Sequence, residues 1–166
     1  MRYWTGSAIA LFLALLQASS LEQFKVIGVA PNLLLVLLVS WLVVRGLDDV
    51  LPMIAVAGVT MGFIGLQTPG LVLLALLPIA GLGALRELRV IHSDILLVLA
   101  FVLAATAAYE LTIVASLMAS GGGLDLLTAL RSAVVPAAIV NAAITPPAYI
   151  LMRLAKPSDR RNRLAY

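Results

Sequence analysis

The chain has no cysteine and only one histidine. Without thiols it can form neither a disulfide bond nor a thiolate metal site, and its redox compartment stays open. A metal or catalytic role for His92 would need partner residues, and no second histidine is present to help supply them. We therefore interpret His92 as part of a solvated polar loop between two helices.

Charged residues are also scarce, at 11% of the chain against 63% hydrophobic residues. This composition is typical of an integral membrane protein. The 166 residues accommodate about six spans with short loops, which leaves no room for a second, soluble domain. We expect an all-α bundle of six transmembrane helices over residues 1–155, followed by a basic cytoplasmic tail over 156–166.

Six apolar stretches predict the positions of the spans, since roughly 20 apolar residues cross a hydrocarbon core of ~30 Å. They lie at about 3–20, 26–45, 50–66, 71–85, 95–118 and 132–153. Between the fifth and sixth stretches, Asp125 can cap a short helix that leads into the last span. The second stretch is apolar on all sides, which suits either lipid contact or a general packing role.

The basic residues predict the orientation of these spans. With the N-terminus inside, the cytoplasmic side carries Arg2, Arg45, Arg86, Arg89, Arg153, Lys156, Arg160, Arg161 and Arg163, and the outer side carries Lys25 and Arg131. Nine against two follows the positive-inside rule and places both termini in the cytoplasm. The net charge of +3 is then an orientation signal with some attraction to anionic lipid, so we expect no nucleic-acid partner.

Sequence motifs for catalysis are absent. The chain has no glycine-rich nucleotide loop with Lys-Ser or Lys-Thr, no G-x-S-x-G, and no cluster of metal ligands. The predicted outer side offers only Glu22 and Asp125 in loops and Glu110 within a span, too few groups for an acid–base pair. We therefore expect a non-catalytic scaffold or binding subunit without cofactor or metal.

The last span contains residues that disturb a transmembrane helix. Proline removes a backbone donor and crowds the carbonyl four residues earlier, and in lipid the freed carbonyl needs a partner within the protein. Two interpretations follow: a kinked packing helix whose Asn141 satisfies a neighbour's backbone, or a discontinuous helix lining a functional cavity. We favour the first for the kink and keep the second for Asn141. The predicted helix breaks are Pro31, Pro78, Pro136, Pro146 and Pro147.

Polar residues gather at one predicted depth in the outer leaflet. At a rise of 1.5 Å per residue, Glu110 lies about 12 Å from the outer end of its span, Asn141 about 13–14 Å, and Asn32 about 9 Å. We expect Glu110 and Asn141 to face one interior crevice that opens outward. There Asn141 would hydrogen-bond either the carbonyls freed by proline or Glu110.

Glu110 is the carboxylate that lies well inside a span. A carboxylate in the bilayer is energetically costly and usually faces the bundle interior, so it is a candidate functional residue. The alternative is a protonated or hydrogen-bonded structural residue, satisfied by Thr106 one turn earlier. Both interpretations stay open.

Small residues predict where helices approach closely. Gly58 and Gly62 form a G-x-x-x-G pair, and Gly65 extends this glycine-rich third span. On the first span, small residues recur every four positions, at Ala10, Ala14 and Ala18.

The chain resembles the family of the rod shape-determining protein MreD. The resemblance is carried by Pro31-Asn32 before a leucine-rich second span, by Val140-Asn141 followed by Pro146-Pro147 and the terminal Leu151-Met152-Arg153, and by the glycine-rich third span ending Thr68-Pro69-Gly70. One position departs from the family. Relatives often carry an acidic residue where this chain has Gly62, so any role of that carboxylate is not carried over unless Glu110 substitutes for it.

What the resemblance implies is a subunit of the cell-elongation machinery in the cytoplasmic membrane of rod-shaped bacteria. Such a subunit is expected to support peptidoglycan synthesis and cell shape by binding the single-span protein MreC. Through MreC it would reach the SEDS glycosyltransferase, its penicillin-binding transpeptidase and, indirectly, the MreB filament.

An alternative is the substrate-binding membrane subunit of an energy-coupling-factor vitamin transporter, which is similar in size, span count and fold. Its members dock a coupling protein through an alanine stripe on the first span, and Ala10, Ala14 and Ala18 match that pattern. The loops, however, lack the aromatic and polar residues that usually close over a vitamin. A small ion or proton carrier built around Glu110 is a third possibility.

Overall fold

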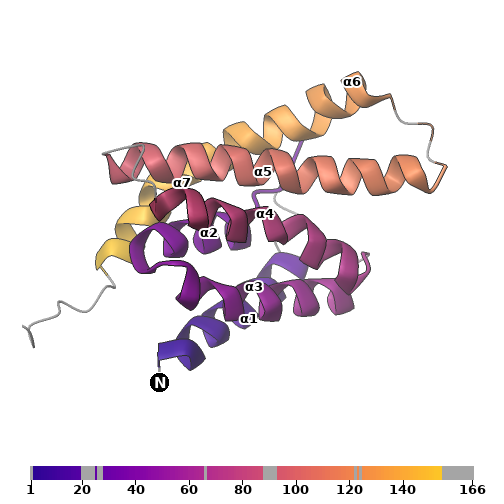
Figure 1. The fold of residues 1–166 in the computed structure, drawn as a ribbon. Coiled ribbons are helices and arrows are strands. Elements are labelled where there is room, and N and C mark those ends of the chain that lie inside the picture. Colours follow the sequence, from indigo (N-terminus) through magenta and orange to yellow (C-terminus); the bar gives the residue numbers. More distant parts are fainter. Residues whose placement is uncertain are drawn as a thin grey trace, which may run out of the picture.

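The computed structural model describes residues 2–19, 25, 28–65, 67–87, 93–121, 123 and 125–154. This part of the chain is all-helical and contains no strand (Figure 1). The elements are α1 (Arg2–Ser19), α2 (Leu33–Arg45), α3 (Leu47–Ile64), α4 (Pro69–Glu87), α5 (Asp94–Ala119), α6 (Leu126–Ala129), a π-helical turn (Leu130–Val134) and α7 (Val135–Leu154). The predicted basic tail over 156–166, the polar loop around His92 and the loop residue Glu22 lie outside the described residues.

Among the described residues, four helices are long and apolar enough to cross a membrane: α3, α4, α5 and the continuous helical stretch Leu126–Leu154. The chain is therefore a multi-pass helical membrane protein. The apolar parts of α1 and α2 are shorter, covering Trp4–Ser19 and Leu33–Arg45. With 13 residues, α2 is only about 20 Å long, which is less than the ~30 Å hydrocarbon core.

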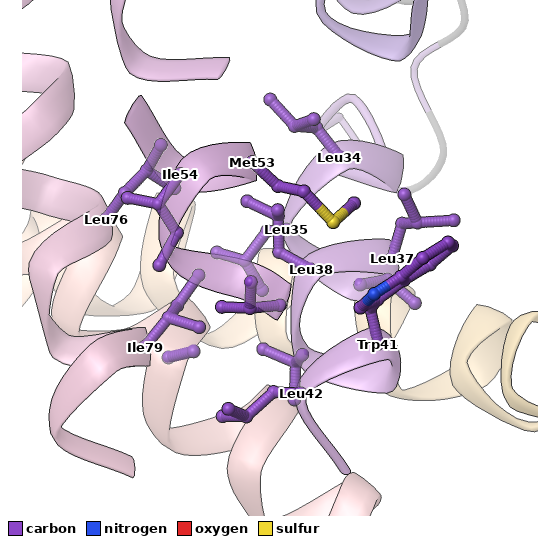
Figure 2. Close-up of a cluster of buried hydrophobic side chains, with 14 of the residues drawn as sticks. Leu34, Leu35, Leu37, Leu38, Trp41, Leu42, Met53, Ile54, Leu76 and Ile79 are labelled. Atoms are coloured by element: carbon purple, nitrogen blue, oxygen red, sulfur yellow. The ribbon is translucent and has the colours of Figure 1, made fainter. Parts of the chain in front are cut away.

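The short helix α2 is the centre of the bundle. It contacts α1, α3, α4, α5 and α7, and every residue from Leu34 to Val43 is buried. Leucines of α2 pack against Met53 and Ile54 of α3 and against Leu76 and Ile79 of α4 (Figure 2). Of the two roles considered for its all-round apolar surface, packing inside the protein is the one observed.

The helical part of the second predicted span begins later than its apolar pattern predicts. Residues 28–32 are not helical, and α2 starts at Leu33, immediately after Pro31-Asn32. Asn32 is the N-cap: its side chain accepts a hydrogen bond from the Leu35 N–H. A capping asparagine starts a helix because it satisfies a donor that the first turn leaves open, and this ends the non-helical segment here.

The prolines of the later spans do not interrupt their helices, contrary to the predicted breaks. Pro78 lies inside α4, and Pro146 and Pro147 lie inside α7. The irregularity in the last span lies earlier, at the π-helical turn that precedes Pro136. There the Val135 N–H donates to the Leu130 carbonyl, five residues back, just before the proline that has no N–H to give.

Two of the three predicted packing glycines lie against α4. A side chain at Gly58 would overlap the Leu73 side chain, and one at Gly62 would overlap the backbone of Pro69. Gly65 is different. It is the residue after α3, its N–H donates to the Met61 carbonyl at 2.8 Å, and an added Cβ would meet that same carbonyl. Gly65 therefore ends the helix and makes no close contact with another one.

Candidate functional site

A cluster of buried polar side chains joins four helices at the start of α2. We call it the polar cluster. Its members are Gln17 of α1, Asn32 at the N-terminus of α2, Thr106 of α5, and Asn141 and Thr145 of α7. Apart from Asn32, which is half-buried, all of them are buried.

Asn141 is the centre of the polar cluster and is 1% exposed. Its Oδ1 accepts a hydrogen bond from the Asn32 backbone N–H at 2.9 Å, and its Nδ2 donates to Thr106 Oγ1 at 3.1 Å. One side chain on α7 thus holds both the start of α2 and the middle of α5. The hydroxyl of Thr145 donates to the Asn141 backbone carbonyl at 2.7 Å, one turn along the same helix.

Gln17 holds the same segment from the side of α1. Its Nε2 donates to the Pro31 carbonyl at 3.0 Å, and its Oε1 accepts from the Leu33 N–H at 3.1 Å. The amide therefore pairs with both a carbonyl and an N–H of the non-helical backbone around Asn32. Because these groups lie away from water, each would otherwise be a costly unpaired polar group.

Together these contacts satisfy the N-terminus of α2. The N–H groups of Asn32, Leu33 and Leu35 bond to the side chains of Asn141, Gln17 and Asn32, respectively. A helix that begins within a membrane protein leaves its first N–H groups without partners unless side chains supply them. The polar cluster supplies acceptors for three of these N–H groups, so α2 can start in the interior.

The polar cluster has the chemistry of a structural hydrogen-bond network. Its side chains are neutral amides and hydroxyls, which exchange no proton near neutral pH, and the hydrogen bonds that they make are to one another or to backbone groups. Within the described ranges, no group of three His, Asp or Glu residues is placed to hold a metal ion.

Asn32 and Asn141, predicted at similar depths, are in direct contact. Of the partners considered for Asn141, a neighbour's backbone is confirmed, because its Oδ1 accepts from the Asn32 N–H. The predicted bond to Glu110 or to a carbonyl freed by proline was wrong, since the second partner of Asn141 is Thr106. Thr106, considered as a partner for Glu110, instead accepts the Asn141 amide.

Glu110 lies outside the polar cluster. It is half-buried on α5, one turn beyond Thr106, or about 6 Å along the axis at the standard rise. It makes no hydrogen bond and no ion pair with any residue in the described part of the chain.

Two buried polar residues were not identified from the sequence. Gln17 is a single amide in an apolar span. Its role depends on the non-helical backbone around Pro31, which the sequence pattern did not predict. Asp49 falls between the predicted spans 26–45 and 50–66, but it lies in the first turn of α3 and is 5% exposed. Only Gly46, with a positive φ of 104°, separates α2 from α3, so the predicted loop is a single residue.

The Arg45 guanidinium at this turn lies 4.7 Å from the centre of the Trp41 ring. This is a cation–π contact within the last turn of α2.

The structure shows a multi-pass helical membrane protein in which the polar cluster connects the central helix to its neighbours. Comparison of the chain with models of known protein families, with curated proteins and with solved structures found no match.

Proposed function

We propose that this protein is a non-catalytic scaffold subunit of the bacterial cell-elongation machinery, of the MreD type. One observation supports this most. Two of the segments that resemble the MreD family, Pro31-Asn32 and Val140-Asn141, are distant in sequence but are hydrogen-bonded to each other at 2.9 Å. Both segments therefore contribute to one contact, which holds α2 against α7. A structural contact of this kind fits a scaffold protein, whose function depends on how its helices are arranged.

The scaffold proposal also fits the surface that the chain exposes to possible partner helices. The polar groups of the cluster are used inside the bundle, whereas large apolar side chains such as Phe12, Phe63 and Leu151 are exposed. Such side chains face lipid or another membrane helix. We propose six spans in the cytoplasmic membrane with both termini in the cytoplasm, and binding to the single-span protein MreC. The SEDS glycosyltransferase, its transpeptidase and MreB would be reached through MreC.

The alternative, a vitamin-binding subunit of an energy-coupling-factor transporter, loses its main support. That assignment needs the alanine stripe of the first span on the outside, ready to dock a coupling protein. Ala10 and Ala14 are both 0% exposed, in a helix whose main contact is α3. The stripe is used inside this chain, so it is not available to a coupling protein.

Co-purification set against small-molecule retention tests the proposal. The chain is purified in mild detergent after co-expression with MreC from the same bacterium, and the pure protein alone is analysed for bound thiamine, biotin and riboflavin. We expect stoichiometric recovery of MreC and no vitamin. Recovery of a vitamin with no affinity for MreC would overturn the scaffold proposal in favour of the transporter subunit.

A further inference from the structure

One face of α5 carries leucines at every seventh position around Glu110. Leu96, Leu103 and Leu117 are 57%, 44% and 47% exposed, and Glu110 occupies the third position of this series, between Leu103 and Leu117. We call these four residues the heptad stripe. Residues seven apart lie on the same side of a helix, displaced by only about 20° per heptad. The heptad stripe is therefore a continuous line of about 31 Å, which matches the thickness of the hydrocarbon core.

Glu110 makes this stripe unlike an ordinary lipid-facing surface. It makes no hydrogen bond and no ion pair within the described residues. The hydrogen bonds Tyr149–Asp94 and Asn141–Thr106 show that α5 and α7 run antiparallel. Thr106 of α5 pairs with Asn141 of α7, and Glu110 lies four residues after Thr106. In an antiparallel pair, the residue of α7 at the level of Glu110 therefore lies four residues before Asn141, which is Ala137.

The neighbouring helix offers no donor at this level. Ala137 is 4% exposed and has no polar side chain, and Pro136 beside it lacks even a backbone N–H. Leaving a carboxyl group within the bilayer without a partner is energetically costly, and such residues usually find one. Helices α2 and α4 also pack against α5, but Glu110 bonds to none of their described residues, so the missing donor comes from outside the described part of the chain.

We propose that the heptad stripe docks the transmembrane helix of a partner, which presents a hydrogen-bond donor opposite Glu110. This inference rests on the proposed function, because the occupant is the single span of the partner named there. In a left-handed helix pair, apolar residues occupy two positions of every heptad, and one polar residue at such a position fixes the register of the pair. The heptad stripe supplies one of these two positions in four successive heptads, with Glu110 as the polar residue, and its length fits one complete span.

Two measurements on the co-purified complex test this surface. The first compares Glu110→Ala with Leu111→Ala, a control on the same helix at a position that is 39% exposed and lies off the stripe. An interhelical hydrogen bond in a membrane changes an equilibrium by about threefold to thirtyfold. We expect Glu110→Ala to lower partner recovery by that factor, while Leu111→Ala leaves it unchanged and both variants alone keep the thermal stability of the wild type.

The second measurement does not depend on the Glu110 variant. Because the chain has no cysteine, single cysteines at Leu103 and Leu117 can be cross-linked to cysteines in the partner span, with Leu111 as the matched control. We expect cross-links at the two stripe positions and few at Leu111.

The possible results are distinguishable. A wild-type chain that recovers no partner overturns the proposed function and this surface with it. A wild type that recovers its partner, with equal recovery by Glu110→Ala or with cross-links as strong at Leu111 as on the stripe, overturns the docking surface alone. A loss of stability in Glu110→Ala without the partner would show that Glu110 is satisfied within the chain, and would also overturn it.

Discussion

At the scale of single residues, Asn141 has the largest expected effect on the fold. It supplies the acceptor for the Asn32 N–H and the donor for Thr106, so Asn141→Ala leaves buried polar groups on two other helices without partners. At about 0.6–2 kcal/mol for each interhelical bond, we expect destabilisation of roughly 1–4 kcal/mol. Thermal unfolding in detergent measures the change.

Thr112→Val is the control for this variant. Thr112 Oγ1 donates to the Ala108 carbonyl of its own helix at 2.8 Å, so its removal breaks no contact between helices. We expect an unfolding temperature close to that of the wild type. An Asn141→Ala variant as stable as Thr112→Val would contradict the fastening role of the polar cluster.

At the scale of elements, the approach of α3 to α4 depends on Gly62. A Cβ there would overlap the Pro69 backbone, whereas a Cβ at Gly81 would meet nothing within 4 Å. Gly62→Ala should therefore destabilise the fold by about 1–3 kcal/mol through overpacking. Gly81→Ala makes the same chemical change in open space, and its better helix propensity should stabilise by up to about 1 kcal/mol. Equal unfolding temperatures of the two variants would rule out this close contact.

The same elements show how far the sequence could be interpreted. Apolar length placed α3, α4 and α5 within three residues of their ends, because long hydrophobic runs bounded by polar residues leave few alternatives. The start of α2 was placed wrongly because its apolar pattern begins before Pro31. The helix itself waits for the Asn32 cap, whose environment depends on side chains from α1 and α7.

The polar cluster could be predicted only in part, and for a related reason. Prolines around an asparagine drew attention to Asn141, and they also suggested carbonyls as its partners. The backbone at the start of α2 fits the other interpretation, in which Asn141 satisfies a neighbour's backbone, but neither the helix that supplies it nor the bond to Thr106 was predicted. Contacts between residues separated by 109 positions are set by the packing of the whole bundle, which no local pattern in a single sequence contains.

At the scale of the whole molecule, the proposed orientation in the membrane rests on the distribution of basic residues. A single cysteine at Ser120, an exposed residue after α5, should react with an impermeant thiol reagent added outside intact cells. One at Ser158, in the predicted cytoplasmic tail, should react only after the membrane is opened. The absence of native cysteine removes any background. Reaction of Ser158→Cys from outside, with Ser120→Cys shielded, would reverse the proposed orientation.

The proposed role of this protein in cell elongation is tested most sharply by depleting it in a rod-shaped bacterium that carries it. Cell width and length are measured by microscopy as the chain is depleted and then supplied again from an inducible copy. We expect cells to lose their rod shape and become round on depletion, and to recover it when the wild-type chain is supplied. Cells that remain rods of unchanged width after the protein has become undetectable would contradict it.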